Sequence, residues 1–172
     1  PDAGTRIADH VATVHGPDAR IHAMVHNAGI TRDRMLANQD EKIWDSVLEV
    51  NLAAEIRINE YLLQDVPGGL AEEARIVGIA STSGVAGNKG QTNYAASKAA
   101  LTNLAVNLAA ELGPRGIRVN AVAPGPIWTP LIPATMAPDK VEGFGSDTPL
   151  GRAGHPVEVA AAFVFLASDE AS

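Results

Sequence analysis

The chain has 172 residues, 46% of them hydrophobic and only 4% aromatic, so we expect a single domain with a core of Ala, Val, Leu and Ile. Its formal net charge is −7 and it has no basic run, which argues against nucleic-acid binding. The absence of cysteine excludes disulfides and thiolate metal sites, and the five histidines lack metal-ligand spacing, so no metal site is expected.

The chain begins with a predicted helix and strand. Apolar residues recur at helical spacing between residues 7 and 14, and Gly16 ends this pattern. Residues 21–25 form an apolar run typical of a strand. Residues 26–29 close that strand in a turn, where small residues let the backbone approach a ligand closely.

A long helix is predicted next, from Asp40 to about Leu63. Aspartate is a favoured N-cap residue, and apolar residues line one face of the segment. Asn51 lies in the middle of this helix, where asparagine is unfavourable. We therefore expect Asn51 to have a specific hydrogen-bonding role.

The stretch from Ser81 to Lys98 carries the clearest chemical pattern. It follows an apolar run at residues 76–80 that predicts a buried strand, and its glycines predict an open loop before an Ala-rich helix at about 92–112. Tyr94 and Lys98 are four residues apart and share one helix face. A lysine ammonium favours the phenolate and lowers the phenol pKa, so that tyrosine can exchange protons near neutral pH. Ser81 can donate a hydrogen bond to the same substrate oxygen.

The last part of the chain contains another predicted strand and a final helix. Residues 117–123 form the strand, and residues 156–167 form the helix, with proline suited to its first position. Between them, residues 133–149 are expected to be an irregular, mobile lid over a substrate. Alternating strands and helices predict a parallel, doubly wound sheet with a dinucleotide at the carboxyl ends of its strands.

Four ordered motifs resemble the short-chain dehydrogenase/reductase family. They are Asn27-Ala28-Gly29, Val50-Asn51-Leu52, Ser81 with Tyr94-x-x-x-Lys98, and Arg118 to Gly125. The resemblance covers nearly the whole chain. Residues 27–33 and 87–94 are most similar to 3-oxoacyl-[acyl-carrier-protein] reductases, whereas residues 125–131 and 144–149 are more similar to glucose/ribitol-type dehydrogenases.

The resemblance implies an α/β, Rossmann-like doubly wound parallel sheet that here lacks the first strands and the last strand. Residues 1–172 are then a single partial domain of this type. The Gly-rich phosphate turn and the residue that selects NAD or NADP are not in the sequence. The coenzyme is therefore expected to be NADP or NAD, with no preference assigned.

The resemblance also implies a role for each motif residue. The activity would be NAD(P)-dependent hydride transfer between a nicotinamide and a carbonyl or alcohol, with 3-oxoacyl thioester reduction in fatty acid biosynthesis as the expected reaction. The residues implied in catalysis are Asn51, Ser81, Tyr94 and Lys98. Those implied in cofactor binding are Asn27, Ala28, Gly29, Tyr94, Lys98, Pro124, Gly125, Ile127 and Thr129.

The expected partners are a small carbonyl or acyl-thioester substrate and a second copy of the chain, in a homodimer or homotetramer that pairs the long helices. A cytoplasmic enzyme fits the lack of a signal peptide and of a membrane-length apolar run. Two alternatives remain open. One is a sugar or polyol dehydrogenase of the same family, and the other is a non-catalytic truncated partner of a full-length reductase.

Overall fold

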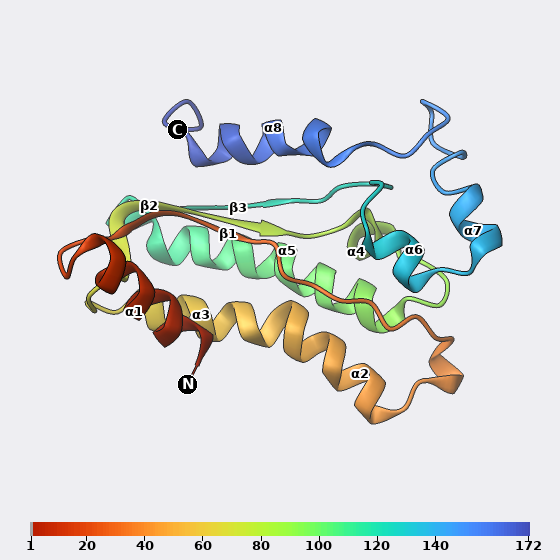
Figure 1. Ribbon diagram of the computed structural model, residues 1–172, viewed down its shortest axis with the longest axis horizontal. Helices are drawn as coiled ribbons and strands as arrows, with labels where there is room; N and C mark the ends of the chain where they lie inside the picture. The colour runs from red at the N-terminus through yellow and green to blue at the C-terminus, as the bar shows by residue number, and fades with distance from the viewer. Residues whose placement is uncertain (1) are drawn as a thin grey trace.

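A computed structural model describes residues 2–172 (Figure 1). Helices and strands alternate along the chain for most of its length, as predicted. The elements are α1 (Ala3–His15), β1 (Ile21–His26), η1 (Leu36–Asn38), α2 (Glu41–Leu48), η2 (Glu49–Ala53), α3 (Ala54–Leu62), β2 (Leu70–Ile79), α4 (Thr82–Ala86), α5 (Thr92–Leu112), η3 (Gly113–Arg115), β3 (Arg118–Val122), α6 (Leu131–Thr135), α7 (Pro138–Glu142) and α8 (Pro156–Ala167).

The three strands form a parallel sheet in the order β1-β2-β3. Val25 of β1 lies beside Val77 of β2, which lies beside Asn120 of β3. Parallel neighbours need a crossover, and α2 to α3 and then α5 provide the two crossovers. Figure 1 shows α1, α3 and α5 on one face of the sheet and α8 on the other. The predicted α/β architecture with a parallel sheet is confirmed.

Several helix ends form as their residue types predict. The side chain of Asp40 accepts a hydrogen bond from the backbone N–H of Ile43 at 2.7 Å, which confirms it as the N-cap of α2. Pro156 occupies the first turn of α8, where its missing N–H costs nothing. Glu158 accepts a hydrogen bond from the backbone N–H of His155 at 2.7 Å and completes that cap.

Two segments predicted to be irregular are partly helical. Ser81 caps α4, accepting a hydrogen bond from the N–H of Ser83 at 3.1 Å, so the expected open loop begins as a short helix. The segment at residues 133–149 contains the end of α6 and all of α7, and proline opens α7. Both segments contain turns, as predicted, but the short helices α4 and α7 within them were not predicted.

The long helix predicted around Asn51 is not a uniform α-helix. Its middle turn, η2, is a wider π-helical turn between α2 and α3. Asn51 lies within η2 and is 1% exposed. The unfavourable position of this asparagine in the sequence therefore coincides with an irregular turn that buries it.

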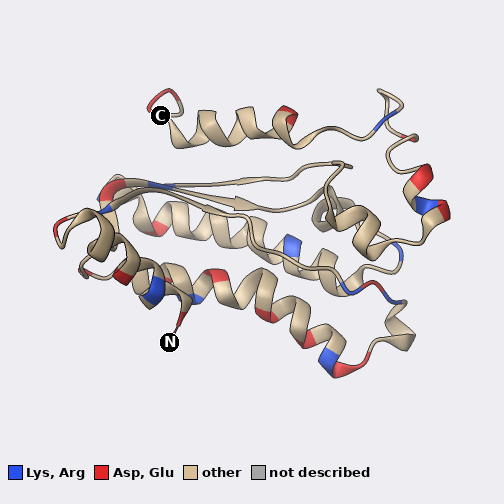
Figure 2. Ribbon diagram, viewed as in Figure 1, with Lys and Arg blue, Asp and Glu red and all other residues tan. Residues whose placement is uncertain are grey.

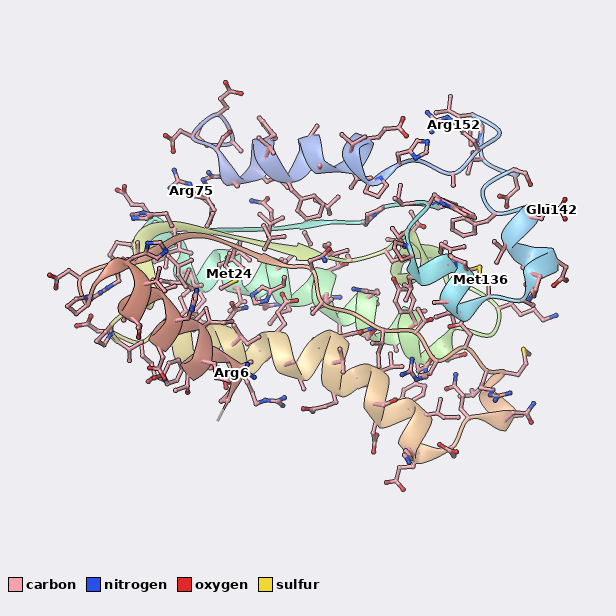
Figure 3. The ribbon with its side chains drawn as sticks, viewed as in Figure 1. Arg6, Met24, Arg75, Met136, Glu142 and Arg152 are labelled. Carbon is pink, nitrogen blue, oxygen red and sulfur yellow. The ribbon has the colours of Figure 1, made fainter. Side chains whose placement is uncertain are left out.

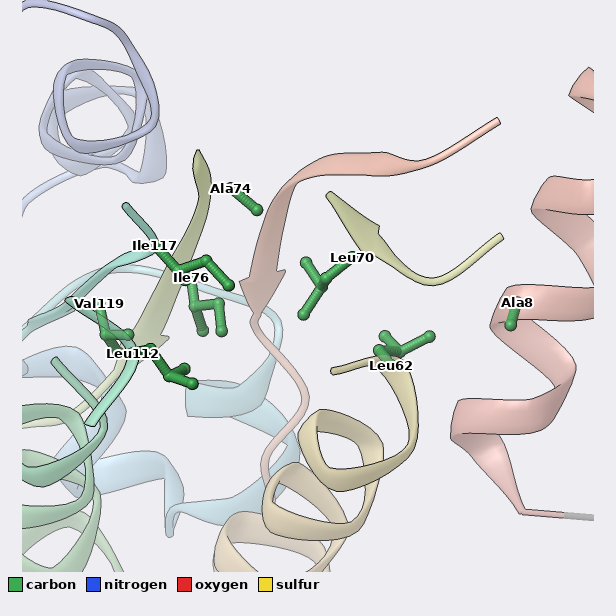
Figure 4. Close-up of a cluster of buried hydrophobic side chains, with 8 residues drawn as sticks. All are labelled: Ala8, Leu62, Leu70, Ala74, Ile76, Leu112, Ile117 and Val119. Atoms are coloured by element: carbon green, nitrogen blue, oxygen red, sulfur yellow. The ribbon is translucent and has the colours of Figure 1, made fainter. Parts of the chain in front are cut away.

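The hydrophobic core lies between the sheet and the helices α1, α3 and α5, toward the beginnings of the strands. Its buried members are Ala8, Leu62, Leu70, Ala74, Ile76, Leu112, Ile117 and Val119 (Figure 4). They are small or aliphatic, as the low aromatic content predicts.

The Asp, Glu, Lys and Arg side chains of the strands lie within the first six residues of β2 and at the first residue of β3, at Glu72, Glu73, Arg75 and Arg118 (Figure 2). Two of them hold the end of α8. Arg75 points toward this region and pairs with Asp169 (Figure 3), while Arg118 donates to the carbonyl oxygen of Ser168 at 2.6 Å. The carboxyl ends of the strands are left without charged side chains of their own.

Candidate active site

The predicted catalytic segments meet at the carboxyl ends of the strands. The turn after β1 carries Asn27, Ala28 and Gly29, and Ser81 follows β2. Pro124 follows β3, and its carbonyl oxygen accepts a hydrogen bond from the N–H of Thr82 at 3.1 Å. Because all three strands are parallel, these ends share one edge of the sheet, where ligands of open α/β sheets bind.

Tyr94 and Lys98 lie on the first turns of α5 and face this edge. The ammonium nitrogen of Lys98 is 5.6 Å from the centre of the Tyr94 ring, as expected for residues four apart on one helix face. Burial raises the pKa of Tyr94, and a side-chain hydrogen bond with Ser81 partly offsets that rise. The structure therefore brings together the serine, tyrosine and lysine that the sequence selected.

Lys98 is held rigidly although it carries a charge. It is 4% exposed, and its Nζ donates a hydrogen bond to the carbonyl oxygen of Ile79 at 2.6 Å. Burial lowers the pKa of Lys98, because water no longer solvates the ammonium, while the carboxylate of Glu55 raises it. The Ile79 carbonyl fixes the direction of the side chain and leaves its other N–H groups for a ligand.

Asn51 joins η2 to the turn after β1. Its Oδ1 accepts a hydrogen bond from the N–H of Ile30 at 2.8 Å, and its Nδ2 donates to the carbonyl oxygen of Ile30 at 3.0 Å. The same Nδ2 lies 3.2 Å from the Oγ of Ser97, whose hydroxyl donates to the carbonyl oxygen of Tyr94. Asn51 thus ties the turn after β1 to the first turns of α5.

The environment of Tyr94 differs from the expectation based on spacing. Burial is the largest influence and raises the pKa of Tyr94, with a further rise from the Asp33 carboxylate, although Ser81 opposes it. The spacing with Lys98 predicts a lowered pKa, but the ammonium is directed at Ile79 rather than at the phenol oxygen. Tyr94 is therefore a protonated phenol at neutral pH, which suits proton donation.

The start of α5 is fixed by two buried polar residues. Asn93 accepts a hydrogen bond from the Tyr94 N–H at 2.8 Å through its own side chain and donates to the carbonyl oxygen of Arg32 at 3.2 Å. Gln91 donates to the carboxylate of Asp33 at 2.8 Å. These bonds link the segment after β1 to the first turn of α5 and so set the position of Tyr94.

The segment after β3 lies at the same edge of the sheet but pairs with another part of the chain. Ile127 forms an isolated parallel bridge with Gly154, and the N–H of Trp128 donates to the Gly154 carbonyl oxygen at 2.8 Å. The Thr129 carbonyl oxygen accepts from Ile132 at 3.0 Å and begins α6. Within residues 2–172, no hydrogen bond joins Ile127 or Thr129 to Tyr94 or Lys98.

Three residues of this region were not selected from the sequence: Ser97, Asn93 and Glu55. Ser97 and Asn93 are fully buried, and both make hydrogen bonds that hold the predicted residues in place. Glu55 lies four residues after Asn51 and is coupled to Lys98. The four-residue spacing that identified Tyr94 and Lys98 would also have identified Glu55, had it been applied to Asn51.

The residues at this edge fit a nicotinamide nucleotide. Gly29 presents bare backbone beside two polar atoms of the site, because a Cβ at this position would lie 3.5 Å from Asn51 Oδ1 and 3.7 Å from Lys98 Nζ. Apart from Gly125 itself and its chain neighbours, no heavy atom of the described residues lies within 4 Å of the place where a Cβ of Gly125 would stand. The fixed ammonium of Lys98 can bind a ribose hydroxyl, and the bare backbone beside it leaves room for the flat nicotinamide ring.

Comparison with known proteins assigns the class. A family model described as enoyl-(acyl carrier protein) reductase matches residues 3–172. This chain belongs to the short-chain dehydrogenase/reductase family, as its motifs indicate.

Individual relatives have different printed activities. The chain is 46% identical over 89% of its length to a 3-oxoacyl-[acyl-carrier-protein] reductase of Thermotoga maritima, and covers 61% of that protein. It is 41% identical over 97% of its length to a glucose and ribitol dehydrogenase homolog of Oryza sativa, and covers 57% of it. A third relative is an NADPH-dependent aldehyde reductase of Arabidopsis thaliana, 36% identical over 97% of the chain and covered to 56%. The chain thus spans less than two thirds of these relatives.

Two further properties concern the part of the chain that the structure describes. None of its helices is both long and apolar enough to cross a membrane. The His, Asp and Glu side chains in residues 2–172 form no group of three that could hold a metal ion.

Proposed function

We propose that this chain carries the catalytic half of a nicotinamide-dependent oxidoreductase that reduces a carbonyl group to an alcohol. The carrying observation is the convergence of Ser81, Tyr94 and Lys98 at the ligand-binding edge of a parallel sheet. Membership in the short-chain dehydrogenase/reductase family supports it. We further propose that residues 1–172 are part of one Rossmann-type domain.

The chain's own residues supply the acid chemistry. The bound nicotinamide would supply the hydride, and Tyr94 would donate its phenolic proton to the oxygen that becomes negative as hydride reaches the carbonyl carbon. Ser81 would hold the same oxygen by a hydrogen bond. The raised pKa of Tyr94 keeps the proton available at neutral pH, which favours reduction over oxidation there.

The remaining motif residues would bind and align the cofactor. Lys98 would hold the nicotinamide ribose through the N–H groups that Ile79 does not use. Asn51 would position the turn after β1 for the cofactor, because its side chain bonds to both the N–H and the carbonyl oxygen of Ile30. Asn27, Ala28 and Gly29 would contact the adenosine side, and Pro124, Gly125, Ile127 and Thr129 the nicotinamide side.

The substrate that we propose first is a 3-oxoacyl thioester, with NADPH or NADH as reductant. The Thermotoga relative bears this activity in its name and is 46% identical to this chain. A second candidate is a sugar or polyol. Trp128 and Phe144 stack at a tilt with ring centres 6.3 Å apart in the segment after β3, and aromatic faces suit sugar rings. The rice relative supports this candidate.

Tyr94→Phe tests the proposal. The phenylalanine keeps the ring and removes the proton, so reduced-nicotinamide oxidation with an acetoacetyl thioester should fall by roughly 10²–10⁴-fold, the usual contribution of a general acid. Coenzyme affinity, measured by fluorescence titration, should stay within about twofold, because Lys98, which carries the proposed ribose contact, is unchanged in this variant. A Tyr94→Phe protein that turns over at the wild-type rate would contradict the mechanism.

The same assay separates the two substrates. A panel containing acetoacetyl thioester, glucose, ribitol and small aldehydes, each with NADH and NADPH, should show the highest kcat/KM for the thioester. A higher kcat/KM for a sugar would replace the first substrate with the second. Tyr61→Phe is the matched control for Tyr94→Phe, because it also removes a phenol hydroxyl, but Tyr61 packs against Gly4 of α1 and lies outside the site.

A further inference from the structure

A polar stripe runs along η2 and α3 beneath the sheet, with Asn51 and Asn59 buried and Glu55 partly buried. Asn51, Glu55 and Asn59 follow one another at four-residue spacing, so they share the face that packs on the strands. A helix that covers a sheet normally presents apolar residues on that face. Asn51 binds the backbone of Ile30, and Asn59 lies 2.8 Å from the Nε2 of His26. Glu55, between these two residues, places a carboxyl group on the same face of the helix.

The carboxylate of Glu55 lies against the backbone of β2. A Cβ added to Gly78 would come within 3.3 Å of Glu55 Oε1, so glycine at this position makes room for the carboxylate. The next residue of the strand, Ile79, provides the carbonyl oxygen that binds Lys98 Nζ. Glu55 and Lys98 therefore reach adjacent residues of the same strand, one from α3 and the other from α5.

The two groups influence each other electrostatically. Burial raises the pKa of Glu55 to about 7, although the Lys98 ammonium lowers it. In return, Glu55 raises the pKa of Lys98, which burial lowers. Glu55 consequently changes its charge within the neutral pH range, next to the lysine that stands beside Tyr94.

The other charged groups nearby occupy different positions. From β1, His26 bonds to Asn59 one helical turn further on, and burial lowers its pKa, so it is neutral where Glu55 titrates. From α5, Tyr94 is protonated in that range. Asp2 and Glu49 act on Arg57, an exposed residue of α3. Gly78 of β2 presents no side chain.

We propose that Glu55 is a positioning residue that makes the reduction respond to pH between about 6 and 8 by setting the net charge next to Lys98. This inference rests on the proposed function. When Glu55 is protonated, the Lys98 ammonium, 5.6 Å from the centre of the Tyr94 ring, has no neighbouring anion and stabilises the negative charge that develops on the phenol as it gives up its proton. When Glu55 is ionised, it offsets that charge and the phenol becomes a weaker acid. Reduction should therefore slow as Glu55 loses its proton.

The test compares Glu55→Gln with Glu60→Gln in the full protein. Both variants remove one negative charge from α3, but Glu60 is exposed and away from the site. Wild type and Glu60→Gln should lose roughly threefold or more in kcat for reduction from pH 6 to pH 8 through a step near pH 7. Glu55→Gln should lack this step and keep the faster rate. Glu55→Asp retains a carboxyl group and should restore a step.

A second readout does not depend on turnover. Infrared difference titration should show a carboxylic-acid carbonyl band that disappears near pH 7 in wild type and Glu60→Gln, and that is absent from Glu55→Gln. Turnover with a Glu55→Gln profile identical to wild type, or no such band in wild type, would overturn the proposal alone. Absence of turnover in every protein would remove the proposed function, and the positioning role of Glu55 with it.

Discussion

The two ends of the interface between the sheet and its helix layer are built from different side chains. Near the beginnings of the strands the interface is aliphatic, with Leu62, Ile76 and Ile117 completely enclosed (Figure 4). Near the carboxyl ends, η2 and α5 bury Asn51, Ser97 and Lys98 instead. The helix layer thus has an apolar end and a polar end a few turns apart.

The apolar end of the interface stabilises the fold, whereas the polar end positions the residues of the candidate site. Burying an aliphatic side chain stabilises the fold by about 1.5–3 kcal/mol, whereas a buried polar group that finds its hydrogen bonds contributes little net free energy. The polar end is kept in place by bonds such as those of Asn51 to Ile30, and the apolar end holds the elements together. Substitutions at one end should therefore affect one property and leave the other nearly unchanged.

Lys98→Met should give the largest effect and confine it to activity. Methionine preserves the buried stem and removes the ammonium, so turnover should fall by roughly 10²–10⁴-fold and coenzyme affinity should fall with it. The free energy of unfolding should change by about 1 kcal/mol or less, because losing the hydrogen bond to the Ile79 carbonyl is offset by no longer burying an ammonium. Lys89→Met, at an exposed loop position, is the control. Unchanged coenzyme affinity would remove the ribose role of Lys98.

Leu62→Ala should give the opposite result. Leu62 is fully buried in the aliphatic end, and truncation leaves a cavity that costs about 2–5 kcal/mol of unfolding free energy in urea titrations. The kcat per folded molecule should remain at the wild-type value, because no bond to the site is lost. A kcat that falls in proportion to stability would show that the two ends are not separate.

Glu55→Gln should have a smaller effect that depends on pH. The pKa of Glu55 is raised from 4.5 to about 7 on folding, so between these values the unfolded chain is ionised while the folded chain holds its proton. Wild-type stability therefore falls as pH rises through this window, by at most about 3 kcal/mol. The variant should equal wild type at pH 4 and be more stable at pH 8. Equal urea midpoints at pH 8 would contradict the burial of the charge.

Much of the fold follows from local pattern. The apolar runs predicted all three strands, and the N-cap Asp40 and the proline at 156 predicted the starts of α2 and α8. The short helices α4 and α7 were not predicted, because glycine and proline are typical both of turns and of helix ends. The π-helical turn at η2 was missed because a period of 3.6 residues was assumed throughout.

The site could be predicted only as far as its residues are close in sequence or match a family motif. Tyr94 and Lys98 share a helix, so spacing alone placed them together. The pairing of Glu55 with Lys98 joins two helices through a strand, and no local pattern contains it. The direction in which the pKa of Tyr94 is shifted could not be predicted either, because it depends on burial and on Asp33, a residue far away in the sequence.

The turn at η2 constrains how this segment can change its length. A π-helical turn contains about one residue more than an α-helical turn, and each residue of a helix adds a rotation of about 100°. Deleting one residue between Glu49 and Ala53 would therefore turn α3 about its own axis and carry Glu55 and Asn59 away from the strands. Evolution can exchange side chains in this segment one by one, but an insertion or deletion here would move a whole row of them at once.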